Sequence, residues 1–183
     1  NLQWAGLIVA KTRTLSLGQQ YFFANKAAQL VKEEGIAIPI LLGNNKKIKA
    51  LAKEHSLEIS DLTIIDPKSE ENEATRNRFG ELLFAKRNRK GYNLYEAKKI
   101  MRERNYFGCM MVEQGEADAL ITGLTRKYPD TLRPVLEIIG VNKVVNKLAG
   151  MYVMLTKRGP ICFADTTINE FPTAQDLVDI TLL

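Results

Sequence analysis

The sequence predicts an α/β domain in which helices flank a layered, mostly parallel sheet. Short apolar runs, in which polar and apolar residues do not alternate, are separated by longer stretches in which apolar residues recur with the period of a helix. The run at 36–43 is apolar on both faces, as expected for a strand that is covered on both sides. Strands that alternate with helices are typical of a parallel sheet. The 183 residues contain no internal repeat and no low-complexity linker, so they predict one domain.

The first βαβ unit is predicted from an apolar run at 7–10, a helix at 19–34 and the strand at 36–43. Gly35 provides the helix stop, because glycine readily adopts the left-handed conformation that ends many helices. The helix is expected to bury one apolar stripe, formed by Phe22, Phe23, Ala27, Leu30 and Val31.

A short basic helix and a third strand are predicted next. Asn44 or Asn45 can cap the helix, which would end near His55. The run at 62–67 is the third strand, and it is closed by proline.

The longest helical pattern covers 69–89, with acidic residues in its first turns and basic residues in its last, which suits the helix dipole. It ends in the segment KRNRK at 86–90, which places four cations together. Two interpretations stay open for this segment. The cations can stabilise the helix C-terminus, or they can contact a phosphate group.

Asn93 and Glu96 form a variant of the capping box, which predicts the start of a basic helix that reaches Arg104. Residues 105–114 are more apolar and are expected to lie against the sheet, with methionines filling core space.

A candidate ligand site follows these helices. Residues 118–123 are predicted to form a short buried strand that ends on Thr122 and Gly123. After a loop, Asp130 or Thr131 is expected to cap another helix.

Arg133 falls in the first turn of that predicted helix, next to Pro134. A cation there opposes the helix dipole, whereas a phosphate or carboxylate would meet backbone donors and a guanidinium group together. Ligands of open α/β sheets also bind beyond the carboxyl ends of strands. Arg133 is therefore a candidate anion ligand, and the alternative is an exposed side chain that pairs with Asp130 or Glu137.

An antiparallel hairpin is predicted from strands at 149–156 and 161–165, and it is expected to join the sheet. Asp165 ends the second strand, where it would either face the same cleft as Arg133 or cap a turn.

The last helix is predicted to start at Thr173, with Asp176 in the capping-box position. The chain begins with Asn1 and stops on the apolar turn 180–183. We therefore expect a truncated domain within a larger polypeptide, since natural termini are usually solvated.

Composition narrows the classes of function. A net charge of +5 and a pI of about 9.2 favour anionic partners such as phosphorylated cofactors, acidic metabolites or nucleic acid. Cys109 and Cys162 each lie in an apolar run, which predicts buried thiols in a reducing cytosol. His55 is the only histidine, so a histidine-rich zinc site is excluded.

No apolar run approaches the length of a membrane span, and we expect a cytoplasmic protein. The sequence lacks G-x-G-x-x-G, a Walker P-loop, H-E-x-x-H and C-x-x-C, which argues against a self-contained dehydrogenase, kinase or metalloprotease.

Four long segments resemble a known family. They are AAQLVKEEGIAIPILLG, RNYFGCMMVEQGEADALITGLTRKYPDTLRPVLEIIG, NKLAGMYVMLTKRGP and FADTTINEFPTAQDLVDITLL. From about Ala27 to the end, the chain resembles the phosphotransacetylase-like domain at the C-terminus of large bacterial NADP-dependent malic enzymes, within the phosphate acetyl/butyryltransferase family. Stand-alone phosphotransacetylases share the sparser pattern GEAD, DT-x-RP and FAD…N…PTA, whereas TRKYPDT and AGMYVMLTK resemble the malic-enzyme version. Residues 11–23 depart from the family pattern, which has an acidic segment there.

The resemblance implies an isocitrate or isopropylmalate dehydrogenase-like fold, with two lobes around a cleft for coenzyme A and acetyl phosphate. Two family arginines that bind phosphate or coenzyme A groups correspond to Arg87 and Arg133. The ligand-binding residues expected from the sequence are Arg87, Thr122, Gly123, Asp130, Thr131, Arg133 and Asp165. No catalytic residue is assigned, because the family's catalytic serine, arginine and aspartate correspond to sequence beyond residue 183.

From this resemblance we expect a regulatory domain of an NADP-dependent malic enzyme that binds acetyl-CoA, or CoA and phosphate. NADP and a divalent metal would be bound only by a malic-enzyme region outside this chain. The first alternative is an active phosphate acetyltransferase, which transfers acetyl between phosphate and CoA.

Two further alternatives do not involve acetyl transfer. An RNA-binding module would use KRNRK and TRKY, but only three tyrosines are available for base stacking near these cations. A purely structural oligomerisation domain is the other. We expect acetyl-CoA or acetyl phosphate as partner, no nucleic acid, no membrane, and assembly into homo-oligomers.

Overall fold

The computed structural model describes residues 3–5, 17–122, 127–141, 148–165 and 168–182, with the backbone alone for 3–5 and 17–23. The elements in chain order are β1 (Gln3–Ala5), α1 (Leu17–Glu33), β2 (Ile38–Leu42), α2 (Asn45–Glu54), β3 (Thr63–Ile65), α3 (Glu73–Arg87), the 3₁₀ turn η1 (Asn88–Lys90), α4 (Leu94–Ile100), α5 (Arg104–Glu113), α6 (Tyr128–Ile138), β4 (Met151–Thr156), β5 (Gly159–Ala164) and α7 (Ala174–Leu182). They form two compact units, Asn1–Ile139 and Gly140–Leu183. The mixed α/β class predicted from the sequence is confirmed.

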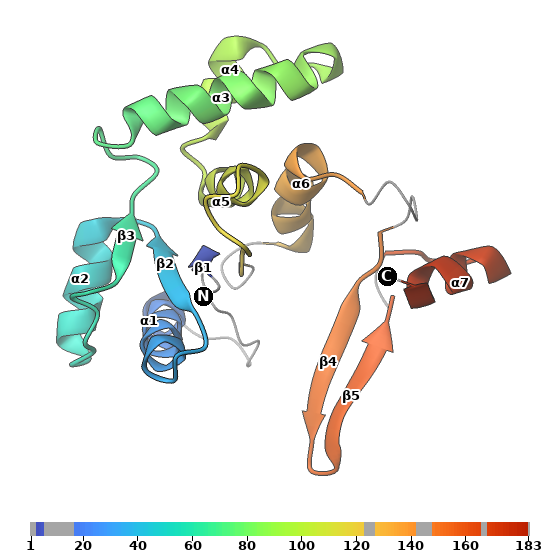
Figure 1. The fold of residues 1–183 in the computed structure, drawn as a ribbon, viewed down its shortest axis with the longest axis horizontal. Coiled ribbons are helices and arrows are strands. Elements are labelled where there is room, and N and C mark those ends of the chain that lie inside the picture. Colours follow the sequence, from blue (N-terminus) through green and yellow to red (C-terminus); the bar gives the residue numbers. More distant parts are fainter. Residues whose placement is uncertain (1–2, 6–16, 123–126, 142–147, 166–167, 183) are drawn as a thin grey trace. The chain divides into compact units, whose positions relative to one another are not determined.

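A three-stranded parallel sheet, in the order β1-β2-β3, lies in the first unit (Figure 1). Ile40 pairs with Thr63 and Leu42 with Ile65, so β2 and β3 end side by side. The carboxyl ends of both strands therefore share one edge of the sheet. The run at 7–10, which was predicted as the first strand, lies outside the described residues.

Several helix boundaries follow the predicted local signals. The Asn44 side chain caps α2, and Asn93 and Glu96 complete the predicted capping box of α4. Gly35 and Gly115 follow the ends of α1 and α5 with φ values of +67° and +71°, a region that glycine enters without a steric penalty. These predictions are confirmed.

The stripe predicted for α1 is wrong in part. Leu30 is 45% exposed, whereas Ala24, Asn25 and Ala28 are buried. Ala28 packs in a cluster with residues of β2 and α2 such as Leu41. Small side chains on this face allow α1 to approach β2 and α2 closely, so the larger Leu30 turns outward.

One helix that was predicted to reach Arg104 is interrupted. α4 ends at Ile100, and α5 begins at Arg104. Glu103 causes the new start, because its carboxylate accepts hydrogen bonds from the backbone N–H groups of Asn105 (2.8 Å) and Tyr106 (3.3 Å).

The strand predicted at 118–123 is also wrong, since residues 118–122 form no strand. This segment packs against α5 through a side chain. A Cβ atom added to Gly108 would lie only 2.7 Å from Cδ1 of Leu120. Within the described part of this segment, only Ala119 forms a single β-bridge, and no longer strand forms.

Two hydrophobic clusters stabilise the first unit. The larger joins α3, α4, α5 and α6, and the rings of Phe79 and Phe107 meet in it edge to face at 5.1 Å. The smaller joins α1, α2, β2 and the segment before β3. The helices α3 and α4 run close together at Gly80 (Figure 1). The approach is so close that a Cβ atom added to Gly80 would lie 2.6 Å from Cα of Lys98. This contact fixes the turn after α4 relative to the end of α3.

An antiparallel hairpin forms in the second unit, as predicted, with Lys157 and Arg158 as its loop. The expectation that it joins the main sheet is wrong for the described residues, where β4 and β5 pair only with each other. Pro160 lies in β5 and lacks the N–H group that a further strand would need.

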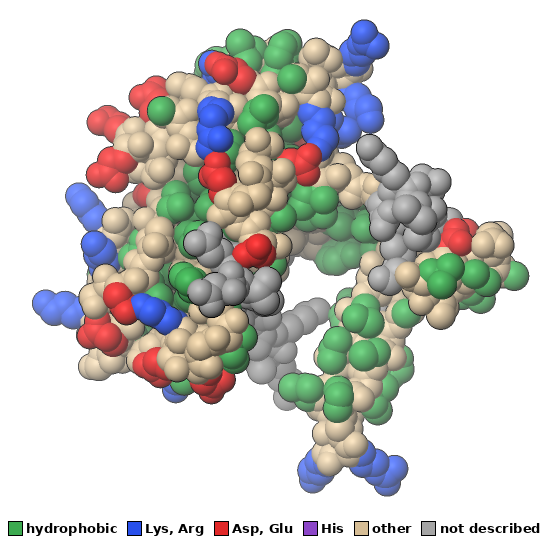
Figure 2. Space-filling view, viewed as in Figure 1, with side chains coloured by type: hydrophobic (Ala, Val, Ile, Leu, Met, Phe, Trp, Pro, Cys, Tyr) green, Lys and Arg blue, Asp and Glu red, His purple; other side chains and the backbone are tan. Residues whose placement is uncertain are grey.

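The second unit exposes large apolar side chains along the hairpin and α7 (Figure 2). The most exposed of them are Met151, Leu155, Phe171 and Leu182. The predicted capping box of α7 is confirmed, since Asp176 N–H donates to Thr173 Oγ1 (3.2 Å) and Thr173 N–H donates to Asp176 Oδ2 (2.9 Å). Within the described part of the chain, no helix has both the length and the apolar character needed to cross a membrane.

Candidate functional site

The two arginines predicted to bind anions lie on α3 and α6. Arg87 is the last residue of α3, and its buried Nε atom has no hydrogen-bond partner among the described residues. Arg133 is exposed on α6. The prediction that it stands in the first helical turn is wrong, because α6 begins at Tyr128 with Pro129 near its start. Pro129 and Pro134 both suit a helix start, and the structure uses the earlier one, which leaves Pro134 buried inside the helix.

A hydrogen-bonded cluster connects the two arginine-bearing helices. Glu137 accepts hydrogen bonds from the hydroxyl groups of Tyr92 (2.6 Å) and Tyr106 (2.7 Å). Arg133 lies one helical turn before Glu137 and therefore on the same side of α6. The Lys86 ammonium group donates to the carbonyl oxygen of Ile138, which ties the end of α3 to the end of α6. We call the set Arg87, Tyr92, Tyr106, Arg133 and Glu137 the tyrosine–glutamate cluster.

Arg87 belongs to this cluster because its charge affects the pKa of Tyr92. Burial raises the pKa of Tyr92, the hydrogen bond to Glu137 raises it further, and the nearby charge of Arg87 acts in the opposite direction. Burial and the hydrogen bonds to Tyr92 and Glu137 raise the pKa of Tyr106 as well. Both phenols therefore stay protonated at neutral pH and hold the Glu137 carboxylate in place.

The other predicted site residues of the first unit are more dispersed. Thr122 donates from its hydroxyl group to Asn105 Oδ1 (2.7 Å), and the Asn105 Nδ2 atom is buried without a partner in the described residues. Gly123 lies outside the described residues. Asp130 is exposed in the first turn of α6, and Thr131 donates to the carbonyl oxygen of Lys127 (3.3 Å).

Asp165 lies in the second unit, where its φ of 51° is left-handed. Its carboxylate accepts hydrogen bonds from Nδ2 of Asn169 (2.6 Å), from N–H of Asn169 (3.1 Å) and from N–H of Gly150 (3.4 Å). Desolvation alone would raise the pKa of Asp165. The hydrogen bonds from Asn169, Gly150 and Ile168 together outweigh this effect and lower the pKa. These contacts favour the turn-capping alternative that the sequence left open.

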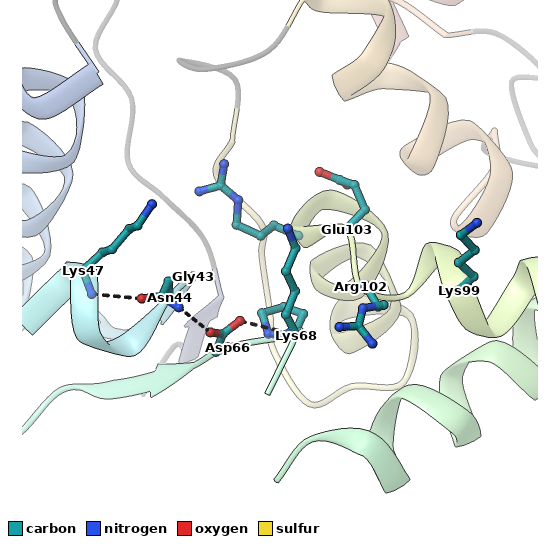
Figure 3. Close-up of a pocket in the computed structure, with 10 residues that line it drawn as sticks. Gly43, Asn44, Lys47, Asp66, Lys68, Lys99, Arg102 and Glu103 are labelled. Carbon is teal, nitrogen blue, oxygen red and sulfur yellow. Dashed lines mark hydrogen bonds between the residues drawn. The ribbon is translucent and has the colours of Figure 1, made fainter. Parts of the chain in front are cut away.

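A cavity of about 580 Å³ lies at the carboxyl ends of β2 and β3 (Figure 3). We call it the strand-end recess. It is lined by Gly43, Asn44, Lys47, Asp66, Pro67, Lys68, Lys99, Arg102, Glu103 and Arg104. Figure 3 shows Lys47 extending from the first turn of α2 and Lys68 from the segment after β3, whereas Arg102 and Glu103 come from the turn between α4 and α5.

The floor of the recess is organised by Asn44 and Asp66. Asn44 Oδ1 accepts from the N–H group of Lys47 (3.0 Å), while its Nδ2 donates to Asp66 Oδ2 (3.1 Å). Asp66 Oδ1 accepts from the N–H group of Lys68 (2.9 Å). Both strand ends and the Asn44 cap were predicted from the sequence, but the recess was not. The lysine that follows each strand end is a sequence signal for it.

A family profile described as "Phosphate acetyl/butaryl transferase" matches residues 23–183. The phosphate acetyltransferase of Thermoanaerobacterium thermosaccharolyticum is 37% identical over 164 residues, which cover 86% of this chain and 48% of that protein. The phosphate acetyltransferase of Bacillus subtilis is 35% identical over 146 residues, covering 79% and 43%. The chain belongs to the phosphate acetyl/butyryltransferase family. It spans about half the length of these relatives.

Solved structures of the family have the same fold. The EutD phosphotransacetylase from Staphylococcus aureus superposes with a TM-score of 0.77 at 27% identity, covering 98% of this chain and 50% of that one. A phosphotransacetylase from Streptococcus pyogenes also gives a TM-score of 0.77, at 28% identity, covering 100% and 52%. The chain therefore has the mixed α/β fold of phosphotransacetylases.

These findings overturn the prediction of a regulatory malic-enzyme domain. The similar proteins named above are phosphate acetyltransferases, at 35–37% identity over most of this chain. The prediction relied on the segments between the shared family motifs, and a single sequence does not show which of those segments vary freely. The family assignment itself is confirmed.

The arrangement in the first unit is suited to binding anions. Among the described residues, no group of three or more histidine, cysteine or acidic side chains is placed to hold a metal ion. Burial raises the pKa of Cys109 to about 12, so this thiol stays protonated and is a poor nucleophile. The described residues offer cations and backbone donors for phosphate groups.

Proposed function

We propose that this chain is part of a phosphate acetyltransferase, which transfers an acetyl group between phosphate and coenzyme A. The observation that carries the proposal is the 37% identity to a phosphate acetyltransferase over 86% of the chain. The family profile runs from residue 23 to 183, across the boundary between the two units, which supports one family domain that includes both.

In this proposal Arg87 and Arg133 bind phosphate groups of coenzyme A or of acetyl phosphate. Acetyl transfer needs cations that hold the phosphoryl oxygens while charge develops on them. Arg87 is half buried, and its Nε atom lacks a protein acceptor in the described chain. Arg133 forms no ion pair with a described residue. Because Glu137 is held by two tyrosines, both guanidinium groups have donors free for a ligand.

The remaining predicted residues have supporting roles in the proposal. Thr122 would border the ligand beside α5, and Asp130 and Thr131 would do so at the start of α6. Gly123, which lies outside the described residues, stays a predicted ligand-binding residue. Asp165 would shape the turn after β5 that its hydrogen bonds to Asn169 stabilise. The proposed transfer of an acetyl group changes no oxidation state, so it does not use NADP as an oxidant or reductant.

The test is carried out on the full-length protein, with acetyl phosphate and coenzyme A as substrates and thioester formation as the readout. Arg133→Ala and Arg87→Ala should each lower kcat/KM for coenzyme A by about 10- to 100-fold, because a hydrogen bond to a charged group contributes about 1.5–3 kcal/mol. Arg89→Ala is the matched control, since Arg89 is exposed in η1, two residues beyond Arg87.

Two outcomes would contradict the proposal. Absence of thioester formation by the full-length wild type would exclude the activity. Unchanged kcat/KM in both arginine variants would show that the ligand binds elsewhere. If both arginines hold one ligand group, the double variant should lose less than the sum of the two single losses.

A further inference from the structure

We propose that the strand-end recess is a second anion site, separate from Arg87 and Arg133, that holds a small ligand carrying phosphate or pyrophosphate groups. Its lining contains five cationic and two carboxylate side chains: Lys47, Lys68, Lys99, Arg102 and Arg104 against Asp66 and Glu103. Its position at the carboxyl ends of two parallel strands is where open α/β sheets commonly bind ligands.

The two carboxylates offset only part of the charge of the five cationic side chains. Asp66 accepts hydrogen bonds from the Asn44 amide and from a backbone N–H group, and Glu103 caps α5 through Oε2. Lys47, Lys68 and Arg102 form no ion pair within the part of the chain that the structure describes. The recess therefore keeps a positive potential that a bound anion would offset.

Two helices add to this potential. α2 and α5 both begin at the recess, and neither has an acidic residue in its first turn. Lys47 stands in the first turn of α2 instead, and Arg104 is the first residue of α5. Lys47 repels the positive end of the α2 dipole and so lowers helix stability unless an anion binds there, whereas at α5 the Glu103 carboxylate already offsets the dipole. Sequence choices that oppose local stability are expected at functional sites.

The lining also limits the class of ligand. A volume of about 580 Å³ lies within the range of about 300–1,000 Å³ that is typical of small-molecule pockets. None of the described residues that line the recess is aromatic, so they offer a nucleobase no ring to stack on. Lysine ammonium groups and the fork of Arg102 match phosphate oxygens. The phosphate groups can come from a free phosphorylated metabolite or from coenzyme A.

The test measures binding of inorganic pyrophosphate to the full-length protein by isothermal titration calorimetry at fixed ionic strength. The double variant Lys68→Ala/Arg102→Ala should bind about tenfold more weakly or worse, because it loses charged hydrogen bonds. Lys49→Ala/Lys53→Ala removes the same charge from exposed positions on α2 outside the recess, and its affinity should stay within about twofold of the wild type. Lys47→Ala alone should weaken binding to an intermediate degree.

Competition identifies the source of the phosphate groups. Displacement of pyrophosphate by coenzyme A, with both ligands weakened in the recess variant, assigns the site to phosphates of the coenzyme. No displacement assigns it to a separate phosphorylated metabolite. The inference is overturned if the wild type does not bind pyrophosphate, if both double variants lose affinity equally, or if Arg133→Ala abolishes binding while the recess variant retains it. Because the readout is binding, the result is independent of whether the protein transfers acetyl groups.

Discussion

The tyrosine–glutamate cluster and the strand-end recess are both rich in cations, but their carboxylates have different partners. In the cluster, Glu137 is held by two tyrosine hydroxyl groups beside Arg87, and Tyr106 is only 6% exposed. In the recess, Asp66 and Glu103 are held by amide and backbone donors, and the cations extend into an open cavity. The comparison teaches that similar runs of basic residues acquire different roles from their surroundings. Changes to the tyrosines of the cluster should affect stability, whereas changes to its arginines and to the recess should affect ligand binding.

The largest effect is expected where α3 meets α4, between the two regions. Gly80→Ala would place a Cβ atom 2.6 Å from Cα and 2.9 Å from N of Lys98. Backbone atoms cannot rotate away, so the substitution should lower the free energy of unfolding by about 2–3 kcal/mol, even after a gain in helix propensity of up to about 1 kcal/mol. Urea denaturation measures the change.

Gly108→Ala is the control for this prediction. Its Cβ atom would meet the ends of flexible side chains, at 2.7 Å from Leu120 Cδ1 and 3.0 Å from Leu42 Cδ1. These ends can rotate, so the loss of stability should be smaller. An equal or larger loss at Gly108 would contradict the close backbone contact between α3 and α4.

Alkaline pH should destabilise the tyrosine–glutamate cluster. The pKa values of Tyr92 and Tyr106 are raised above 10.0, first by burial and then by hydrogen bonds that include Glu137. Above pH 10 the unfolded chain releases these protons while the folded chain retains them, so the free energy of unfolding falls as the pH rises. The slope can reach at most about 1.4 kcal/mol per pH unit for each tyrosine.

Tyr106→Phe removes one of the two titrating groups, so it should reduce this slope by up to about 1.4 kcal/mol per pH unit. Tyr95→Phe is the matched control, because the Tyr95 side chain is 73% exposed. Urea denaturation at several pH values above 9 gives both slopes. Equal slopes in the two variants would show that Tyr106 retains no proton on folding.

The smallest effect compares two helix caps. Asn44→Ala and Asn93→Ala each remove a side chain that accepts a hydrogen bond from a first-turn N–H group, and each should cost about 1 kcal/mol of stability. Asn44→Ala also frees Asp66 to pair with Lys47 or Lys68, so it should weaken pyrophosphate binding several-fold. Asn93→Ala should leave pyrophosphate binding unchanged. Equal pyrophosphate affinities in the two variants would remove the proposed role of Asn44 in keeping Asp66 away from the lysines.

Helix starts were the part of the fold most accessible to sequence reasoning. Asn44, the pair Asn93 and Glu96, and the pair Thr173 and Asp176 all act as predicted. Each cap connects residues at most three positions apart, so the local sequence is enough to predict it.

The errors arose where two local signals competed or where contacts were distant in sequence. Pro129 and Pro134 both fit a helix start, and choosing the later one placed Arg133 one turn too early in α6. At 118–122 the apolar pattern fitted a strand, but Leu120 packs against α5 at Gly108 instead. Neither outcome can be decided without the packing partner.

The α/β class, several helix starts, the hairpin and the family could be predicted from the sequence, because they depend on local patterns and on family motifs. Which charged side chains lie close together depends on the folded structure. The recess draws on 43–47, 66–68 and 99–104, and the tyrosine–glutamate cluster draws on α3, α5 and α6 and the residues between them. Electrostatic energy depends on distance and burial, and both are fixed only when segments far apart in the chain pack together.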